Sequence, residues 1–215
     1  MHSGAATEKS RPSSTEITPG SAAEKEVSHY EARIDQLERE VRTLKTYKKM
    51  AVIDHLTGIF NRRYFDTRLE EETARMSRRG LPFSVALVDL DHFKQINDTH
   101  GHGVGDMVLR EFAHYLKNNL RRVDVVCRVG GEEFAVIMPE TDITAGLVIM
   151  ERILAKLLHH PFNIQQLPEI GVSFSCGLVS NCQSFMDTGE ILDMADQALY
   201  EAKRSGRSRV MARCC

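Results

Sequence analysis

The segment Gly130-Gly131-Glu132-Glu133-Phe134 places two carboxylates side by side between two short runs of β-prone residues. Because those runs span residues 125–129 and 135–138, the segment predicts a β-hairpin, with the paired glycines supplying the positive φ angles of a tight turn. Adjacent carboxylates at a hairpin tip repel each other, and exposure to solvent does not explain why two of them stand side by side. Binding of a divalent cation would explain it. An ordinary acidic hairpin is the alternative that this segment alone leaves open.

Polar motifs flank this hairpin on both sides. Upstream lie Asp89-Leu90-Asp91-His92-Phe93-Lys94, Asn97-Asp98, Gly101-His102 and Gly105-Asp106, and downstream lie residues 195–203 followed by Gly206-Arg207. In this order the motifs resemble the GGDEF family, the diguanylate cyclases, in a variant with glutamate in place of the aspartate. The resemblance covers about residues 54–213.

The resemblance implies a metal site at the end of a strand. Asp89 follows a hydrophobic run, where a carboxylate is costly to desolvate unless it is paired, and in the family fold the hairpin lies beside that strand end. Asp89, the Leu90 carbonyl and Glu132 are the implied ligands of Mg²⁺, or of Mn²⁺ in its place, and Glu133 is an implied catalytic residue as either ligand or base. The alternative for Asp89 is a simple strand-end turn residue.

The implied reaction condenses two GTP molecules into cyclic di-GMP and two pyrophosphates. A homodimer would hold one GTP in each subunit, and the metal would neutralise triphosphate charge and help deprotonate the attacking 3′-hydroxyl. The main-chain N–H groups of residues 91–93 could cradle phosphates. By resemblance the phosphate-binding residues are His92, Phe93, Lys94, Lys203 and Arg207. Basic residues at a helix C-terminus can also simply satisfy the helix dipole.

Asn97 and Asp106 are the implied guanine-binding residues. A carboxylate accepts two hydrogen bonds from the N1–H and N2–H₂ edge of guanine, whereas adenine has no donor at N1. Asp106 therefore favours GTP over ATP. The alternative is that Asp106, beside Gly105, serves only as a helix N-cap.

A second nucleotide site is implied by Arg121-Arg122-Val123-Asp124. Arg121 and Asp124 stand where the family carries its Arg-x-x-Asp inhibitory motif, and Arg152 stands where the family often supplies a further arginine. Arginine can pair with guanine O6 and N7 while aspartate takes the N1/N2 edge, which suits bound cyclic di-GMP. The alternative is a solvated charged stretch between a helix and a strand.

The composition is that of a soluble cytoplasmic protein. Of the 215 residues, 42% are hydrophobic, which is enough for one core, and no apolar run approaches the ~18 residues of a membrane span. A net charge of −2 gives no reason to expect nucleic acid as a partner. The cysteines form no C-x-x-C pair, and Cys127 and Cys176 lie in apolar runs, so we expect buried free thiols there.

Three regions are expected along the chain: a flexible tail over residues 1–23, a coiled-coil helix over 24–50 and the catalytic domain over 51–215. Apolar residues spaced 3-4-3-4-3 with charged residues between them predict the coiled coil; they are Val27, Tyr30, Ile34, Leu37, Val41 and Leu44. An amphipathic helix folded back on its own domain is the alternative.

The domain is expected to be α/β. Helices are predicted over residues 61–79, from Gly105-Asp106 to Leu120, over 142–158 and over 190–205, the last ended by Gly206; strands are predicted over 83–88, 172–179 and 208–211, besides the hairpin. Helices flanking a sheet follow from this order, and the resemblance implies a ferredoxin-like, polymerase-palm-type sheet. The functional alternatives are a catalytically silent receptor of GTP or cyclic di-GMP and a coiled-coil adaptor, although an adaptor leaves the acidic hairpin unexplained.

Overall fold

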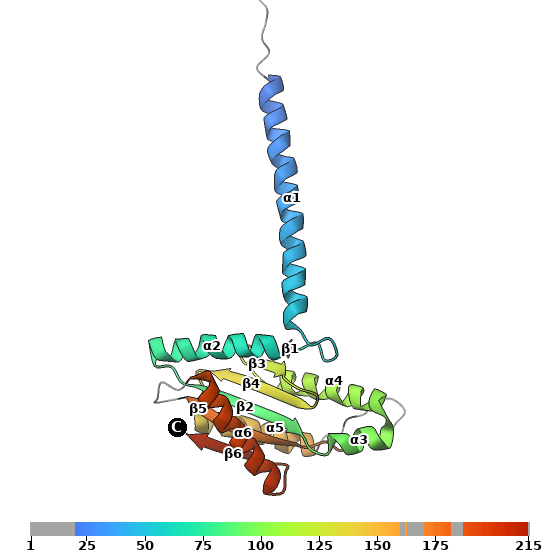
Figure 1. Cartoon of the computed structure of the whole chain (residues 1–215), viewed down its shortest axis with the longest axis vertical. Helices are drawn as coiled ribbons and strands as arrows, with labels where there is room; N and C mark the ends of the chain where they lie inside the picture. The colour runs from blue at the N-terminus through green and yellow to red at the C-terminus, as the bar shows by residue number, and fades with distance from the viewer. Residues whose placement is uncertain (1–19, 160–161, 163–169, 182–186, 215) are drawn as a thin grey trace, which may run out of the picture. The chain divides into compact units, whose positions relative to one another are not determined.

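The computed structural model of the chain describes residues 20–159, 162, 170–181 and 187–214 (Figure 1). It divides into two compact units, residues 1–48 and residues 49–215. Helix α1 runs from Gly20 to Val52, which includes all of the residues predicted to form the coiled-coil helix. The expected tail boundary at residue 23 therefore falls inside α1, and the rest of the expected tail lies outside the described residues. None of the described helices is both long and apolar enough to cross a membrane.

The apolar stripe of α1 is exposed. Its described members are between 44% and 60% accessible, and they are Val27, Tyr30, Ile34, Leu37 and Val41. The side chain of Leu44, the sixth expected member, lies outside the described residues. A row of exposed apolar side chains at heptad spacing is typical of a helix that packs against another helix.

Within the described part of residues 49–215, six strands form one sheet in the order β1-β3-β4-β2-β5-β6. The strands are β1 (Phe60–Asn61), β2 (Phe83–Leu90), β3 (Val125–Arg128), β4 (Glu133–Pro139), β5 (Phe174–Asn181) and β6 (Val210–Cys214). β2 pairs antiparallel with β4 on one side and with β5 on the other. Every residue of β2 is buried, as expected for a central strand covered on both faces.

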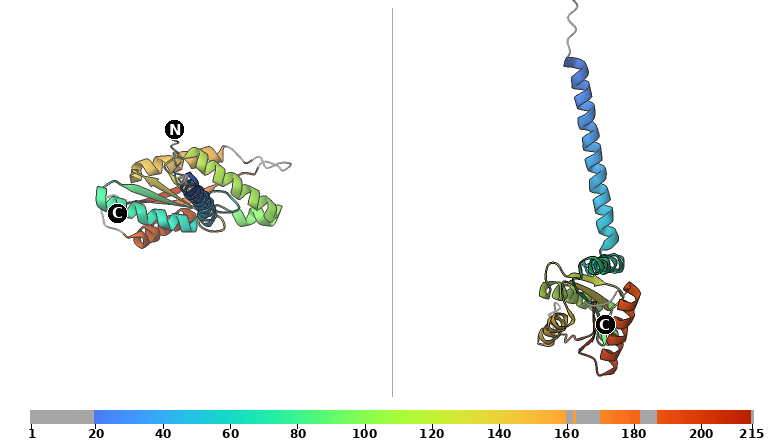
Figure 2. Two further views of the ribbon diagram at one scale, coloured as in Figure 1. Left: turned by 90° about the horizontal axis from the view of Figure 1, so that it is seen from above. Right: turned by 90° about the vertical axis from the view of Figure 1, so that its left-hand side faces the viewer.

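Helices cover both faces of this sheet (Figures 1 and 2). One core packs the central strands against α4 (His102–Asn119) and α5 (Ile143–Leu158), and a second packs them against α2 (Arg62–Arg79) and α6 (Thr188–Arg204). The order β2-α4-β3-β4-α5-β5 is the ferredoxin-like βαββαβ arrangement. The predicted fold class is therefore confirmed.

Local capping explains why the helices begin and end where they do. Asn61 accepts a hydrogen bond from the Tyr64 N–H at the start of α2, and Asp142 accepts one from the Ala145 N–H at the start of α5; both are standard N-cap contacts. At the end of α6, Gly206 has a φ of 109° and the Arg207 N–H donates to the Ala202 carbonyl. This is a Schellman-type end, so the predicted role of Gly206 is confirmed.

Two predictions about helices are wrong. An additional helix, α3 (Phe93–His100), follows β2, and α4 begins at His102 rather than at Gly105-Asp106. Gly101, with a φ of 85°, separates the two helices. Asp106 lies inside α4, past its first turn. It is therefore not a helix N-cap, which was the alternative to a role in guanine binding.

The hairpin is confirmed, but its turn differs from the prediction. Neither Gly130 nor Gly131 has a positive φ, since β3 and β4 are joined by the four residues 129–132, and a loop of that length needs no primed turn. The Val129 and Gly130 N–H groups both donate to the Glu133 carbonyl. The lack of a side chain at Gly130 instead leaves room for the Glu133 carboxylate, since a Cβ there would overlap Glu133 Oε2 unless the glutamate side chain moved.

Candidate active site

The site is built around the end of the central strand β2. Asp89, the penultimate residue of β2, is only 6% exposed and lies in register with Glu133 on β4 and Ser175 on β5. The next residue, Leu90, donates its N–H to the Glu132 carbonyl at 3.3 Å. This main-chain bond holds the hairpin loop against the strand end, so Glu132 and Asp89 are brought together as expected.

A lysine from α6 completes this cluster. Lys203 Nζ lies 2.8 Å from Asp89 Oδ2, and the lysine side chain is one-third exposed. α6 reaches this position because it packs closely on β5: a Cβ on Gly177 would overlap main-chain atoms of Ala195 and Leu199. The ion pair compensates the charge of Asp89, which would otherwise be costly to bury.

The electrostatics of Glu132 reflect the crowding of negative charge. Burial raises the pKa of the Glu132 carboxyl, the charges of Asp89 and Glu133 raise it further, and only Lys203 opposes them. The Glu133 side chain takes a different direction, since its carboxylate lies beside Gly130 and it lines a small cavity with Arg62 and Asp196. The carboxylates of Glu132 and Glu133 therefore lie in different environments.

The donor set at this strand end fits a magnesium ion. Two carboxylates, one of which already attracts a cation, lie beside main-chain carbonyl groups, and Mg²⁺ is commonly held by one or two carboxylates together with phosphate oxygens and water. No group of three or more histidine, cysteine, aspartate or glutamate side chains in the described residues could hold a metal ion. Asp89 and Glu132 would therefore need help from the Leu90 carbonyl, as predicted, and from nucleotide oxygens.

The start of α3 offers main-chain donors. His92 precedes the helix with a φ of 59°, and Phe93 is its first residue. The Gln95 and Ile96 N–H groups donate to the His92 carbonyl, which leaves the first N–H groups of the helix, those of Phe93 and Lys94, without an acceptor within it. The Phe93 side chain is buried and only its main chain could reach a phosphate, whereas Lys94 is exposed. Asp91 does not fit the expected cradle, because its N–H donates to the Ser173 carbonyl.

Asp91 is a residue whose role the sequence did not indicate. Its buried carboxylate accepts hydrogen bonds from Ser173 Oγ and Ser175 Oγ, each at 2.7 Å, and from the Ser208 N–H at 3.0 Å. Arg207 and Ser208 have positive φ values of 61° and 48°, a conformation that costs energy for non-glycine residues. Asp91 thus fixes the strained segment that carries the predicted phosphate ligand Arg207.

The predicted base-binding residues lie on two consecutive helices that pack against each other. Asn97 lies on α3 and Asp106 on α4, both half-buried, and a Cβ on Gly105 would overlap Asn97 Oδ1. Gly105, which directly precedes Asp106, therefore leaves room for the Asn97 side chain where α3 and α4 meet. An amide and a carboxylate together offer acceptors and donors to the edge of a purine.

A separate cavity of about 520 Å³ contains two members of the predicted inhibitory motif. Arg121 and Asp124 line it with apolar residues that include Ile59 and Phe60. The Arg121 N–H donates to Asp124 Oδ2 at 2.8 Å, whereas the buried Asp124 Oδ1 has no hydrogen-bond partner. Burial raises the pKa of this carboxyl.

The third member of the predicted inhibitory set is placed differently. Arg152, on α5, donates to the Asn119 carbonyl at 3.1 Å and is not among the residues that line the cavity.

Comparison with known proteins identifies the family. Residues 51–209 match the family model described as "Diguanylate cyclase, GGDEF domain", which is most of the chain. This chain belongs to the GGDEF family. The match extends over β1 to β5, the hairpin and all of the site residues described above.

Individual GGDEF proteins are similar to the chain in sequence and in structure. The response regulator PleD of Caulobacter vibrioides is 46% identical over 167 residues, which are 77% of this chain and 37% of PleD; the chain thus spans little more than a third of that relative. The coiled coil and GGDEF domain of DgcB from Caulobacter crescentus, solved with c-di-GMP, has a TM-score of 0.79 at 28% identity and covers 89% of this chain and 100% of that one. The active GGEEF domain of a diguanylate cyclase from Vibrio cholerae has a TM-score of 0.65 at 34% identity, covering 71% of this chain and 96% of that one.

Proposed function

We propose that this GGDEF protein is a diguanylate cyclase that converts two GTP molecules into cyclic di-GMP and two pyrophosphates. The observation that carries the proposal is the convergence of Asp89, Glu132 and Lys203 at the end of β2. Two carboxylates and one ammonium group at a strand end, near the two proposed purine-binding side chains, suit phosphoryl transfer. In that chemistry the protein mainly positions the reacting groups and neutralises the charge of the phosphates. The domain named as an active GGEEF domain has the same acidic pair that the chain carries.

In the proposed site, Asp89, Glu132 and the Leu90 carbonyl would hold Mg²⁺, with Mn²⁺ as a substitute. Bound there, the metal would neutralise triphosphate charge and make the 3′-hydroxyl more acidic. Lys203 leaves Asp89 and binds a phosphate oxygen. Glu133, whose carboxylate lies beside Gly130, is a candidate general base rather than a ligand.

The nucleotide is held at its two ends. Asn97 and Asp106 bind the guanine edge, with Asp106 accepting hydrogen bonds that adenine cannot donate. The N–H groups of His92 and Phe93 at the start of α3 bind phosphate oxygens, as helix N-termini commonly do. Their cationic partners are Lys94, Lys203 and Arg207.

The reaction requires two subunits, since each 3′-hydroxyl attacks the α-phosphate of the other GTP. The exposed stripe of α1 supports a parallel coiled-coil homodimer, in which both GTP-loaded domains are held at high effective concentration. We place this homodimer in the cytoplasm. The buried free thiols Cys127 and Cys176 agree with a reducing compartment.

Product would bind in the cavity that contains Arg121 and Asp124. The unpartnered Asp124 Oδ1 supports this assignment, because a buried carboxylate oxygen without a donor is costly and the N1–H of a guanine would supply one. Arg152, placed outside the cavity, would reach the ligand from its rim.

The alternative function is a catalytically silent receptor that binds GTP or cyclic di-GMP and acts through protein contacts. The purified protein should be incubated with Mg²⁺ and GTP, and in parallel with ATP, and the nucleotides separated. We expect cyclic di-GMP and pyrophosphate from GTP alone. Binding of GTP without turnover under these conditions would support the receptor and reject the enzyme.

A further inference from the structure

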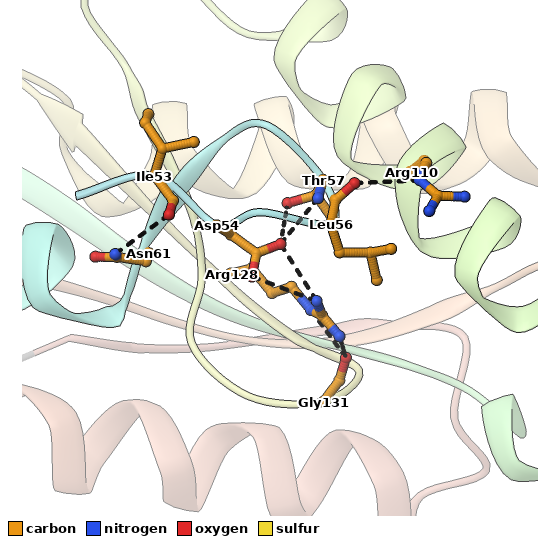
Figure 3. Close-up of polar contacts among 8 residues, drawn as sticks. All are labelled: Ile53, Asp54, Leu56, Thr57, Asn61, Arg110, Arg128 and Gly131. Carbon is orange, nitrogen blue, oxygen red and sulfur yellow. Dashed lines mark hydrogen bonds and ion pairs between the residues drawn. The ribbon is translucent and has the colours of Figure 1, made fainter. Parts of the chain in front are cut away.

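A partly buried arginine at the end of β3 connects the hairpin loop to a distant part of the chain (Figure 3). Arg128 is 14% exposed, and its guanidinium donates from Nε and Nη2 to the Gly131 carbonyl at 3.1 and 2.7 Å. Its Nη1 donates to both carboxylate oxygens of Asp54, at 3.2 and 3.4 Å. One planar guanidinium group thus contacts two loops.

Asp54 opens the junction turn, defined here as residues 54–59, which follows α1 and β-bridge residue Ile53 (Figure 3). Within this turn, Asp54 Oδ1 accepts from the Thr57 N–H at 2.9 Å and from Thr57 Oγ1 at 2.6 Å. The Asp54 N–H donates to the Ile59 carbonyl and the Gly58 N–H to the Asp54 carbonyl. The turn holds the carboxylate in one orientation.

The other end of the connection lies at the acidic pair. Gly131 immediately precedes Glu132, and the carbonyls of both residues are occupied: Gly131 accepts from Arg128, and Glu132 accepts from the Leu90 N–H. Gly131 is exposed and has no side chain to anchor it. Together with the bonds from the Val129 and Gly130 N–H groups to the Glu133 carbonyl, these two contacts, one from β2 and one from Arg128, hold the main chain from which the Glu132 side chain projects.

We propose that Arg128 is a positioning residue that, held by the charge of Asp54, sets the geometry of the hairpin loop for catalysis. The planar guanidinium group is required, because a lysine ammonium cannot donate two hydrogen bonds to the Gly131 carbonyl and also bind Asp54. The negative charge of Asp54 is also required, since it aligns the guanidinium. This inference rests on the proposed cyclase function only where kcat is measured, because amide hydrogen exchange needs no catalytic activity.

Two nearly isosteric changes test the connection. Asp54→Asn keeps an acceptor for Thr57 but removes the charge, and Arg128→Lys keeps the charge but removes the fork. Each should lower kcat by about 10- to 100-fold, as loss of a residue that orients a ligand commonly does, with KM for GTP nearly unchanged. Arg75→Lys is the control, because Arg75 pairs with Glu140 beyond the far end of β4, and it should leave kcat unchanged.

The double variant and amide exchange complete the test. If Asp54 acts through Arg128, the double variant should be no slower than Arg128→Lys alone. Amide hydrogen exchange should accelerate over residues 129–133 in both variants, whereas α2 and α5 should exchange as in the wild type. Full kcat and unchanged hairpin exchange in both variants would overturn the proposal, and so would a loss of protection spread evenly over the domain. If the wild type forms no product, the exchange comparison still decides whether Arg128 positions the loop.

Discussion

Lys203 Nζ lies 2.8 Å from Asp89 Oδ2, so the proposed phosphate ligand compensates the charge of the proposed metal ligand. The two residues lie on different elements, α6 and β2. A cation arriving at Asp89 must displace the ammonium, and a triphosphate arriving with it offers the ammonium a new partner. If Asp89 holds the metal and Lys203 a phosphate, as proposed, this exchange would link metal binding to nucleotide binding without any change in the fold.

Replacing Lys203 by Met should separate these two effects. Without Mg²⁺, the variant should lose about 1–3 kcal/mol of unfolding free energy, because Asp89 stays buried without its partner. Mg²⁺ should then stabilise the variant more than the wild type, since no ammonium competes with it. The measurement is urea unfolding with and without Mg²⁺. Lys156→Met, a change in the last turn of α5, is the control, and an equal Mg²⁺ effect in all three proteins would rule out the competition.

The raised pKa of Glu132 predicts how stability depends on pH in the metal-free protein. Burial and the charge of Asp89 raise this pKa above its ordinary value of 4.5, so the folded state binds more protons than the unfolded state above pH 4.5. Stability should fall as the pH rises through the folded-state pKa. Glu132→Gln removes that loss, so with a chelator present it should match the wild type at pH 4 and exceed it at pH 8.

The same variant has the opposite effect when Mg²⁺ is present. Removing a ligand charge should lower turnover by at least about a hundredfold, the scale seen when a preorganised electrostatic contact is removed. Glu151→Gln, at an exposed position on α5, should change neither stability nor turnover. Wild-type turnover in Glu132→Gln at saturating Mg²⁺ would remove Glu132 from the metal site.

Arg121→Ala tests the inhibitory cavity. Cyclic di-GMP should slow the wild type as it accumulates, and the variant should keep its initial rate while its progress curve stays linear for longer. The reason is geometric: the cavity is formed by the α4–β3 segment and the junction turn and is distinct from the end of β2. Arg78→Ala, in the exposed last turn of α2 and not among the residues that line the cavity, is the control and should leave the progress curve as in the wild type. A linear wild-type progress curve would show that the motif is a charged surface.

The sequence predicted the elements that carry a strong local signal. β2 was evident from its apolar run. α2, α5 and α6 were evident from their periodicity and from Asn61, Asp142 and Gly206, which lie at helix ends. α3 was missed because its eight residues carry few apolar side chains and end at glycines that read as loop. The start of α4 was misplaced for the same reason, since Gly103 and Gly105 lie inside the helix. Gly105 leaves room for the Asn97 side chain, whereas a Cβ on Gly103 would meet no neighbouring atom.

The site was predicted as a set of residues but not as a set of contacts. The family resemblance indicated Asp89, Glu132, Asn97, Asp106 and Lys203, each of which the structure brings to the same end of the sheet or to the adjoining helices. The pairing of Lys203 with Asp89 and the bond from Arg128 to Asp54 depend on packing between segments far apart in sequence. Local patterns do not contain that information, and a charged residue at the end of a strand reads simply as solvated.

The last prediction concerns α1. Ile34 and Leu37 are 55% and 44% exposed, and burying each in a coiled coil would contribute about 1.5–3 kcal/mol. Ile34→Gln with Leu37→Gln should therefore shift the protein toward monomer and make it much slower when dilute, because the two GTP-loaded domains then meet only by diffusion. Concentrating the variant should restore part of the rate.

The measurement is specific activity against protein concentration, together with sedimentation, for the wild type and the double variant. Asp35→Gln lies between the two seam residues but outside the apolar stripe, so it serves as the control and should behave as the wild type. The wild type should show a specific activity that rises with concentration only at the lowest concentrations, and the double variant should show that rise over a much wider range. A double variant that remains dimeric and equally active when dilute would mean that the stripe of α1 does not hold the dimer together.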